Sequence, residues 1–304
     1  MQIGTAQLYS FTSKRMAALS AEVAQANAEV ATGKKALTPS QDPVAAGRLA
    51  GLARTTADEA QYAGNLDLAA TLLQQGDDAL DAMTTQVQRV KELALRAANS
   101  TLSTADLSSI ATELDGILDA MLSIANTVDA RGVPVFAGAD GAVPYSRDPD
   151  GTVVFAGAGD PPPIPVSGVA SVAATDSGAR VFSVRTGDGV TDLFAVVGAL
   201  AAAIRTPDAE ERQAAVQTSL EEVGAAEAGV NAARSSLGAR AARVAMESAQ
   251  LETLATSREA ERSGLEDADP AESILKLQRA MTVLQASQAS FAKLSQLSLF
   301  NYIS

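Results

Sequence analysis

The chain contains no cysteine, no histidine and no tryptophan, and only 4% of its 304 residues are aromatic. Without cysteine, it can form neither a disulfide nor a thiolate metal site. Without histidine, it lacks the commonest general base and the commonest metal ligand. Any chemistry would therefore rest on carboxylates, lysine, tyrosine or hydroxyl groups.

Basic residues are also few, since 23 lysines and arginines face 36 aspartates and glutamates, for a formal net charge of −13. So acidic a chain is a poor partner for nucleic acid. No apolar run approaches the roughly 20 residues that a membrane helix needs. The start, MQIGTAQLYSFTSKRMAALS, has no basic segment followed by an apolar one. We therefore expect a soluble chain without a cleavable signal peptide, not exported by the general secretory route.

Alanine, leucine and valine supply the apolar surface, and they recur at helical spacing. Leu66, Leu73, Leu80, Val87 and Ala94 lie seven residues apart, each followed three places later by another small or apolar residue. This stripe is typical of helices packed along their length. Similar spacing is found at 16–30, 107–128, 216–251 and 274–284. We predict coiled-coil seams here rather than a ligand-binding stripe.

Capping residues predict where the helices begin, and glycines predict where they end. The start signals are Asp42-Pro43, Thr206-Pro207, Asp269-Pro270 and Ser103 with Asp106, and the stop signals are Gly33, Gly132 and Gly264. We expect helices at about 4–32, 43–99, 104–130, 190–205, 208–263 and 270–300. The two longest would each span roughly 80 Å, too long for a compact globule. The expected fold is mainly α, an elongated antiparallel coiled-coil rod of long helices from both chain ends with a small inserted β domain.

The middle of the chain is rich in Gly, Pro, Val and Thr instead. Asp-Gly pairs indicate turns between short β-prone pieces at 133–137, 152–156, 163–166 and 180–184. We expect a small β domain whose ends return to one end of the helical domain. On this reading, residues 140–180 should be replaceable by a short linker without loss of the helices.

These boundaries predict five parts. They are an N-terminal assembly segment (1–42), the N-terminal half of the helical rod (43–131), the inserted β domain (132–189), the C-terminal half of the rod (190–268) and a C-terminal assembly helix (269–304).

No motif in the insert predicts a catalytic, metal or cofactor site. VFAGA occurs twice, from Val135 and from Val154, but neither copy has the spacing or the lysine of a phosphate-binding loop. Asp148 starts a stretch like a calcium loop, yet the twelfth position is Gly159 rather than Glu. The three prolines from Pro161 fit a stiff loop better than a recognition segment. Helical carboxylates fit solvated faces and caps better than a two-carboxylate hydrolase.

Four stretches of the chain carry a family resemblance. They are ATGKKALTPSQDPVAAGRLA at 31–50, RGVPVFAGADGAVPYSRD at 131–148, LEDADPAE at 265–272 and LQASQASFAKLSQLSLFNYIS at 284–304. Together they resemble the flagellar hook–filament junction proteins, the third hook-associated proteins, which are relatives of flagellin. The blocks fall in the family's order, and with the helices between them the resemblance covers nearly the whole chain. The final LSLFNYIS and the SQDPVAA block favour the junction proteins over flagellin.

The resemblance implies a structural protein of the bacterial flagellum, located outside the cell. It implies export in the unfolded state through the flagellar type III apparatus, directed by an uncleaved N-terminal segment. The implied partners are further copies in a ring, the other hook–filament junction protein, flagellin and an export chaperone, with no nucleic acid, membrane or small-molecule substrate. A tubular assembly needs terminal helices that pack on neighbours. The expected assembly interface is Ile3, Leu8, Phe11, Leu294, Leu297, Leu299, Phe300 and Tyr302.

Two other functions remain open at the level of sequence. Filament flagellin belongs to the same structural class but would have to form an unlimited lattice by itself. A secreted coiled-coil effector or translocator belongs to a different class. It should carry a membrane-active apolar hairpin, and none is visible in the sequence.

Overall fold

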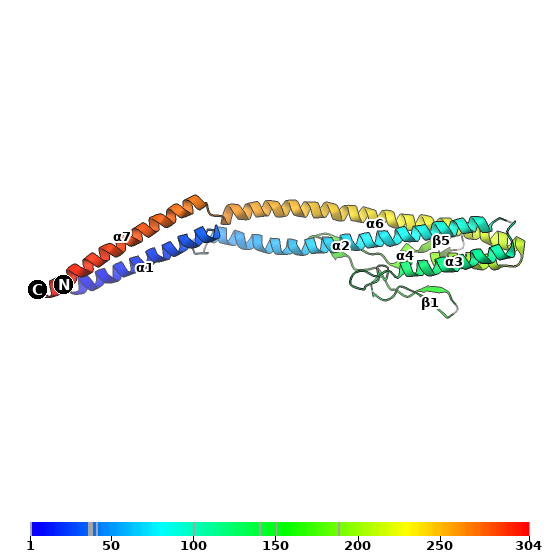
Figure 1. Ribbon diagram of the computed structural model, residues 1–304, viewed down its shortest axis with the longest axis horizontal. Helices are drawn as coiled ribbons and strands as arrows, with labels where there is room; N and C mark the ends of the chain where they lie inside the picture. Colours follow the sequence, from blue (N-terminus) through cyan, green and yellow to red (C-terminus); the bar gives the residue numbers. More distant parts are fainter. Residues whose placement is uncertain are drawn as a thin grey trace. The chain divides into compact units, whose positions relative to one another are not determined.

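The computed structural model describes residues 2–35, 39–40, 42–99, 101–139, 141–149, 151–187 and 189–303. The chain divides into two compact units. The central unit comprises residues 59–252, and the terminal unit comprises residues 1–58 and 253–304. The two longest helices contribute residues to both units (Figure 1).

Helices dominate both units. They are α1 (Gln2–Thr32), α2 (Pro43–Ala97), α3 (Thr104–Ala125), α4 (Gly178–Val181), α5 (Leu193–Arg205), α6 (Ala209–Glu266) and α7 (Pro270–Ile303). Within the described residues, the strands form three short antiparallel pairs between residues 145 and 192, so the helix predicted at 190–205 begins only at Leu193. The pairs are β1 (Tyr145–Arg147) with β2 (Val153–Phe155), β3 (Ile164–Pro165) with β4 (Ser171–Val172), and β5 (Ser183–Thr186) with β6 (Gly189–Asp192). The predicted fold class, mainly α with a small β insertion, is confirmed.

Three of the predicted helix starts are confirmed by their caps. The Asp42 carboxylate accepts a hydrogen bond from the Ala45 N–H at 2.8 Å, and Asp269 does the same for Ala271 at 2.8 Å. Ser103 and Asp106 form the reciprocal capping box of α3. Each cap satisfies N–H groups that the first turn of a helix leaves without a partner.

Of the other predicted start and stop signals, one is confirmed and three are wrong. Asp208 caps α6, accepting from the Glu211 N–H at 2.8 Å, whereas Thr206 ends α5. Gly33 does end α1, with a φ of 67°. Gly132 lies well beyond the end of α3, and Gly264 lies inside α6. An exposed glycine lowers helix stability only modestly, so α6 continues through Gly264 as far as Glu266.

The hydrophobic core belongs to the central unit. Its buried members all lie between Leu66 and Val244, and they include the heptad residues of α2 from Leu66 to Ala94. Three ion pairs tie the helices around this core. Arg89 on α2 pairs with Glu113 on α3 at 2.6 Å, Lys91 on α2 pairs with Glu227 on α6 at 2.7 Å, and Arg234 on α6 pairs with Asp77 on α2 at 3.1 Å.

Five aromatic rings fasten the insert to the helices. Phe136, Tyr145, Phe155, Phe182 and Phe194 form a chain of ring contacts with centroids 4.7–5.8 Å apart. Such pairs add to the stability gained from burial of their area alone. Five of the eleven aromatic residues of the chain therefore lie where the β insertion meets α3 and α5.

Polar contacts join the insert to α2 and α6 as well. The Asn65 amide of α2 donates to the Pro165 carbonyl at 2.7 Å. Arg240 of α6 donates to the Ala173 carbonyl at 2.7 Å and forms an ion pair with Asp176, which is only 9% exposed. Replacing residues 140–180 would remove Tyr145 and Asp176 from these contacts. The loss of these contacts should lower the stability of such a variant, and the retention of its helices stays a prediction.

Two of the four predicted β pieces form strands as expected, since β2 lies in 152–156 and β3 in 163–166. Residues 133–137 do not form a strand. Pro134 forms an isolated antiparallel bridge with Val128, and the Val135 N–H donates to the Thr127 carbonyl at 2.9 Å. The Phe136 carbonyl accepts from the Gly178 N–H of α4 at 2.9 Å. The strand predicted at 180–184 is only partly confirmed. Its first two residues belong to α4, and its last two belong to β5.

The two VFAGA copies lie against each other at their glycine ends. Gly138 and Ala158 form an isolated parallel bridge, and the Ala139 N–H donates to the Ala158 carbonyl at 2.7 Å. A Cβ at Gly138 would lie 2.6 Å from that carbonyl oxygen, and the φ of Gly138 is +84°. Only glycine tolerates both conditions. The repeat is thus a backbone packing contact.

Candidate assembly surface

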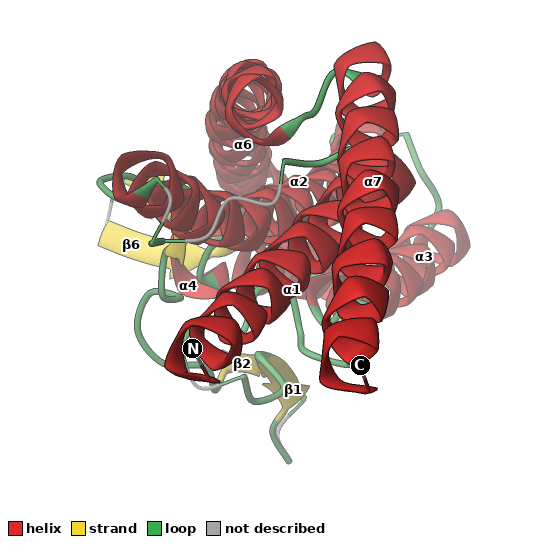
Figure 2. Cartoon of the chain, turned by 90° about the vertical axis from the view of Figure 1, so that its left-hand side faces the viewer, coloured by secondary structure: helices red, strands yellow, loops and turns green. Residues whose placement is uncertain are grey.

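In the terminal unit, α1 and α7 lie side by side, and α1 begins at the end where α7 finishes (Figure 1, Figure 2). The rings of Tyr9 and Phe291 meet edge to face with centroids 5.3 Å apart. Lys276 of α7 pairs with Glu29 of α1 at 3.1 Å. The Glu29 side chain is largely buried, so this ion pair fixes the register of the two helices.

Among the described side chains, the contact between α1 and α7 buries few apolar groups. Those that are buried are the small Ala26 and Ala280. None of the described side chains of the terminal unit joins the hydrophobic core. An isolated helix pair with so thin a seam is marginal in water and needs a further neighbour.

Large apolar side chains are left exposed on this pair. They are Phe11 (63%), Val30 (37%), Ile274 (45%), Leu275 (45%), Met281 (44%) and Val283 (48%). Leu275 and Val283, with Leu19 of α1, also line a groove of about 340 Å³ between the two helices. Exposed apolar side chains of this size are candidates for burial against another molecule. We call the six exposed residues together with this groove the α1–α7 surface.

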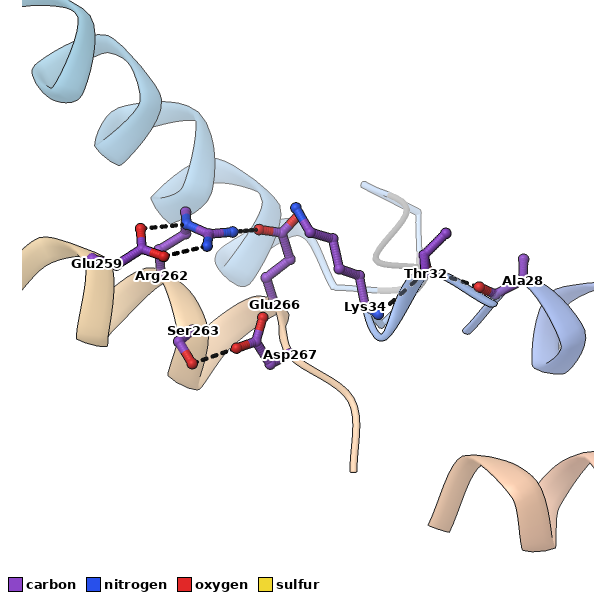
Figure 3. Close-up of polar contacts among 8 residues, drawn as sticks. All are labelled: Ala28, Thr32, Lys34, Glu259, Arg262, Ser263, Glu266 and Asp267. Carbon is purple, nitrogen blue, oxygen red and sulfur yellow. Dashed lines mark hydrogen bonds and ion pairs between the residues drawn. The ribbon is translucent and has the colours of Figure 1, made fainter. Parts of the chain in front are cut away.

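Hydrogen bonds and ion pairs join residues 33–35, after α1, to residues 262–268 at the end of α6, and Figure 3 shows the side chains of Lys34, Arg262 and Glu266 among them. The Lys35 N–H donates to the Glu266 carbonyl at 2.7 Å, and the Ala268 N–H donates to the Gly33 carbonyl at 2.8 Å. The Lys34 ammonium pairs with the Glu266 carboxylate at 3.0 Å, and Arg262 binds the same carboxylate. The segment after α1 is thereby joined to the link between α6 and α7.

This cluster shifts the pKa values of its acids. Hydrogen bonds from Lys34 and Arg262 hold the pKa of Glu266 below its usual value, although burial opposes the shift. Arg262 likewise lowers the pKa of Glu259. Both carboxylates therefore stay charged at neutral pH and bind their partners in this cluster.

Charge is divided unevenly between the units. The terminal unit has 11 basic and 10 acidic residues, a net charge of +1, whereas the central unit has 12 basic and 26 acidic residues, a net charge of −14. The excess negative charge of the chain therefore lies wholly in the central unit. Copies can approach through their terminal units without strong mutual repulsion.

Only one of the predicted interface residues has a described side chain. Phe11 is 63% exposed on α1, and its place in an assembly interface stays a prediction. The side chains of the other seven lie outside the described part of the chain. They are Ile3, Leu8, Leu294, Leu297, Leu299, Phe300 and Tyr302.

The sequence reasoning missed part of the exposed surface. Of the residues placed in the seam, Ala26 is buried as predicted, whereas Val30, Ile274 and Met281 are exposed. The other buried positions there are Glu29, Ser273 and Ala280. The sequence does contain a signal for this exposed surface. The apolar stripe of α7 is wider than a two-position seam, because it includes both Ile274 and Leu275 and both Met281 and Val283. Such width indicates a helix with apolar neighbours on more than one side.

Among the described residues, no group of three or more metal-binding side chains comes together. Nor is any helix of the described chain long and apolar enough to cross a membrane.

Comparison with known proteins identifies both helical regions. Residues 3–140 match the bacterial flagellin N-terminal helical region, and residues 220–303 match the bacterial flagellin C-terminal helical region. The flagellar hook-associated protein 3 of Escherichia coli (strain K12) is 27% identical over 99% of this chain and 99% of its own.

Solved structures share the fold at lower identity. FlgL of Xanthomonas campestris is 20% identical with a TM-score of 0.64, covering 69% of this chain and 99% of its own. The flagellar junction protein FlgL from Legionella pneumophila is 15% identical with a TM-score of 0.61, covering 72% and 99%.

Proposed function

The chain belongs to the flagellin family, and from this premise we propose that it is the subunit that joins the flagellar hook to the filament. It is a structural protein of the bacterial flagellum and not an enzyme. Its likeness over almost its whole length to a flagellar hook-associated protein 3 supports the junction role over that of filament flagellin.

One observation carries the proposal. The terminal helices α1 and α7 fall within the family's two helical regions, yet their described side chains form no hydrophobic core and expose the α1–α7 surface. Burying a large apolar side chain contributes about 1.5–3 kcal/mol. Neighbouring subunits that cover this surface would supply the packing that the isolated pair lacks.

In this proposal, residues 1–42 and 269–304 are assembly segments that pack against neighbouring copies in a ring. The ring has the other hook–filament junction protein on one side and the first flagellins on the other. The chain leaves the cell unfolded through the flagellar export apparatus, accompanied until then by an export chaperone. Its N-terminal segment directs export and is not cleaved.

The location of labelled protein on cells tests this function. The native chain has no cysteine, and Val169 is fully exposed in the insert, so Val169→Cys gives a single site for a gold or fluorescent label. We expect the label in one band between hook and filament. Label along the whole filament would identify a flagellin instead, and label absent from the flagellum would identify a secreted protein of another class.

A further inference from the structure

An open groove of about 370 Å³ lies between α2 and α6 in the central unit. Leu73 and Leu237 form its apolar floor, and Ala70, Asp67 and Asp77 lie along its α2 side. Arg234 pairs with Asp77, whereas Asp67 makes no ion pair within the described chain. The groove thus combines an apolar floor with an acidic rim that can accept a cation.

The insert contacts a different face of the same two helices. It binds α2 at Asn65 and α6 at Arg240. Ala70 follows Asn65 by five residues and Ala245 follows Arg240 by five, which turns each groove position about 140° around its helix. The groove therefore opens away from the insert.

A hydrogen-bonded turn, residues 128–133, lies next to the insert and carries Arg131 together with Asp129. Val135, which follows the turn, packs near Gly76 and Leu237. Within the turn, the Asp129 carboxylate accepts from the N–H groups of Arg131 and Val133 at 2.8 and 3.0 Å. These bonds act together with the antiparallel bridge between Val128 and Pro134, which closes the turn through the backbone.

The side chains that this turn presents are apolar and basic. Val128 and Val133 are 52% and 41% exposed. The Arg131 side chain is 55% exposed and is held by Asp129, at 2.9 Å through Nε and 2.7 Å through one Nη. A guanidinium carries five N–H donors, so one carboxylate leaves donors for a second.

We propose that this turn, residues 128–133, docks in the α2–α6 groove of a second copy of this chain, with Arg131 binding Asp67. The proposal rests on the proposed function, which brings copies together in a ring. The central unit has a net charge of −14, so a contact between two copies is favoured where an exposed guanidinium of one meets a carboxylate of the other that makes no ion pair within the described chain, as Arg131 and Asp67 would. The two surfaces differ, and a head-to-tail contact of that kind closes into a ring where its rotation permits.

A cross-linking experiment tests the contact, because the native chain has no cysteine. Chains carrying Val133→Cys are mixed with chains carrying Ala70→Cys under mild oxidation at high protein concentration. We expect a disulfide-linked dimer from the mixture and little from either chain alone. Chains carrying the fully exposed Val169→Cys replace the Val133→Cys chains as a control, and they should not cross-link to Ala70→Cys.

Charge reversal then tests the ion pair. Adding Asp67→Arg to the Ala70→Cys chain should lower the yield of linked dimer about tenfold. Adding Arg131→Glu to the Val133→Cys chain should restore it, because the two charges are exchanged. The matched reversal Glu221→Arg, on α6 outside the groove, should leave the yield unchanged.

Two results would overturn the docking. One is an equal yield from Ala70→Cys chains alone, which indicates a two-fold contact. The other is no cross-link in the mixture although both thiols react with a small maleimide. If the labelled chain still lies between hook and filament, only the docking fails; if it is absent from the flagellum, the proposed function fails with it.

Discussion

Gly178 allows Tyr145 to reach the aromatic cluster. A Cβ at position 178 would lie 2.6 Å from the Tyr145 ring, and that ring is 2% exposed and contacts three phenylalanines. We expect Gly178→Ala to destabilise the central unit by about 1–3 kcal/mol, because a packed ring cannot move aside. Urea unfolding followed by circular dichroism measures this change.

Gly116 provides the matched control for that substitution. It is exposed in α3, and a Cβ there would meet nothing within 4 Å. Gly116→Ala should stabilise the protein by up to about 1 kcal/mol, since alanine is the better helix former. Equal effects of the two substitutions would contradict the packing argument.

Asp176 depends on Arg240 in the same unit. The carboxylate is largely buried where the insert meets α6, and Arg240 both pairs with it and donates to the Ala173 carbonyl. Arg240→Ala should cost about 3 kcal/mol, because it leaves a buried charge with one fewer partner. Thermal unfolding checks this, with the exposed Arg243→Ala as a control expected to change stability by less than about 0.5 kcal/mol.

At the scale of elements, the link between α1, α6 and α7 should weaken in acid. The pKa of Glu266 is lower in the folded chain than in the unfolded one, so its contribution is fully present above about pH 4.5 and is lost as the pH falls through the folded pKa. Amide hydrogen exchange at Lys35 and Ala268, whose N–H groups bond across this link, should therefore accelerate below pH 4.5.

A matched variant separates this local effect from general acid unfolding. Glu266→Gln keeps the length and polarity of the side chain but removes its charge. It should exchange quickly at Lys35 and Ala268 even at neutral pH, while amides of α3 stay protected. Unchanged protection at those two amides would show that the Glu266 carboxylate does not hold the link.

The long helices could be predicted from sequence because their signals repeat. Heptad residues such as Leu80 and Val87 are fully buried, and caps such as Asp42 and Ser103 lie where the sequence places them. The insert was predicted less well because its pairing is set by contacts distant in sequence. The predicted strand at 133–137 is the clearest failure, since the Val133 N–H donates to the Asp129 carboxylate and the Val135 N–H donates to the Thr127 carbonyl. Pro134 forms no more than an isolated bridge with Val128.

The candidate site was predicted only in outline. An apolar residue at helical spacing can be buried inside its own chain or exposed for a partner, and spacing alone does not separate the two. Phe11 was assigned to the surface, whereas Ile274 and Met281 were assigned to the seam. The register of α7 decides this, and it depends on the ion pair between Glu29 and Lys276, which a single-helix pattern does not contain.

For the molecule as a whole, the core belongs to the central unit alone. Every buried member of the hydrophobic core lies in residues 59–252. We expect a truncated chain of these residues to fold by itself and to melt cooperatively within about 4 °C of the full chain. Scanning calorimetry tests this, and a truncated chain without a cooperative transition would show that the terminal unit contributes to the core.

The terminal unit should in turn decide assembly, and here a junction protein differs from flagellin. Flagellin forms an unlimited lattice, so its surfaces must complement themselves along the tube, whereas a junction subunit has different neighbours above and below. The purified full chain should therefore remain monomeric or form short oligomers under conditions that polymerise flagellin. Sedimentation velocity and electron microscopy measure this.

Phe300→Asp extends the test to cells. Phe300 lies outside residues 59–252, so the substitution should leave folding of the central unit unchanged. It should remove about 1.5–3 kcal/mol of apolar burial from each contact that the side chain makes in the assembly. We expect cells with hooks that shed unpolymerised flagellin into the medium, while the exposed Val169→Asp in the insert leaves filaments intact. Long filaments grown by the purified chain alone would contradict the junction role, because a subunit that propagates by itself has the self-complementary surfaces of a flagellin.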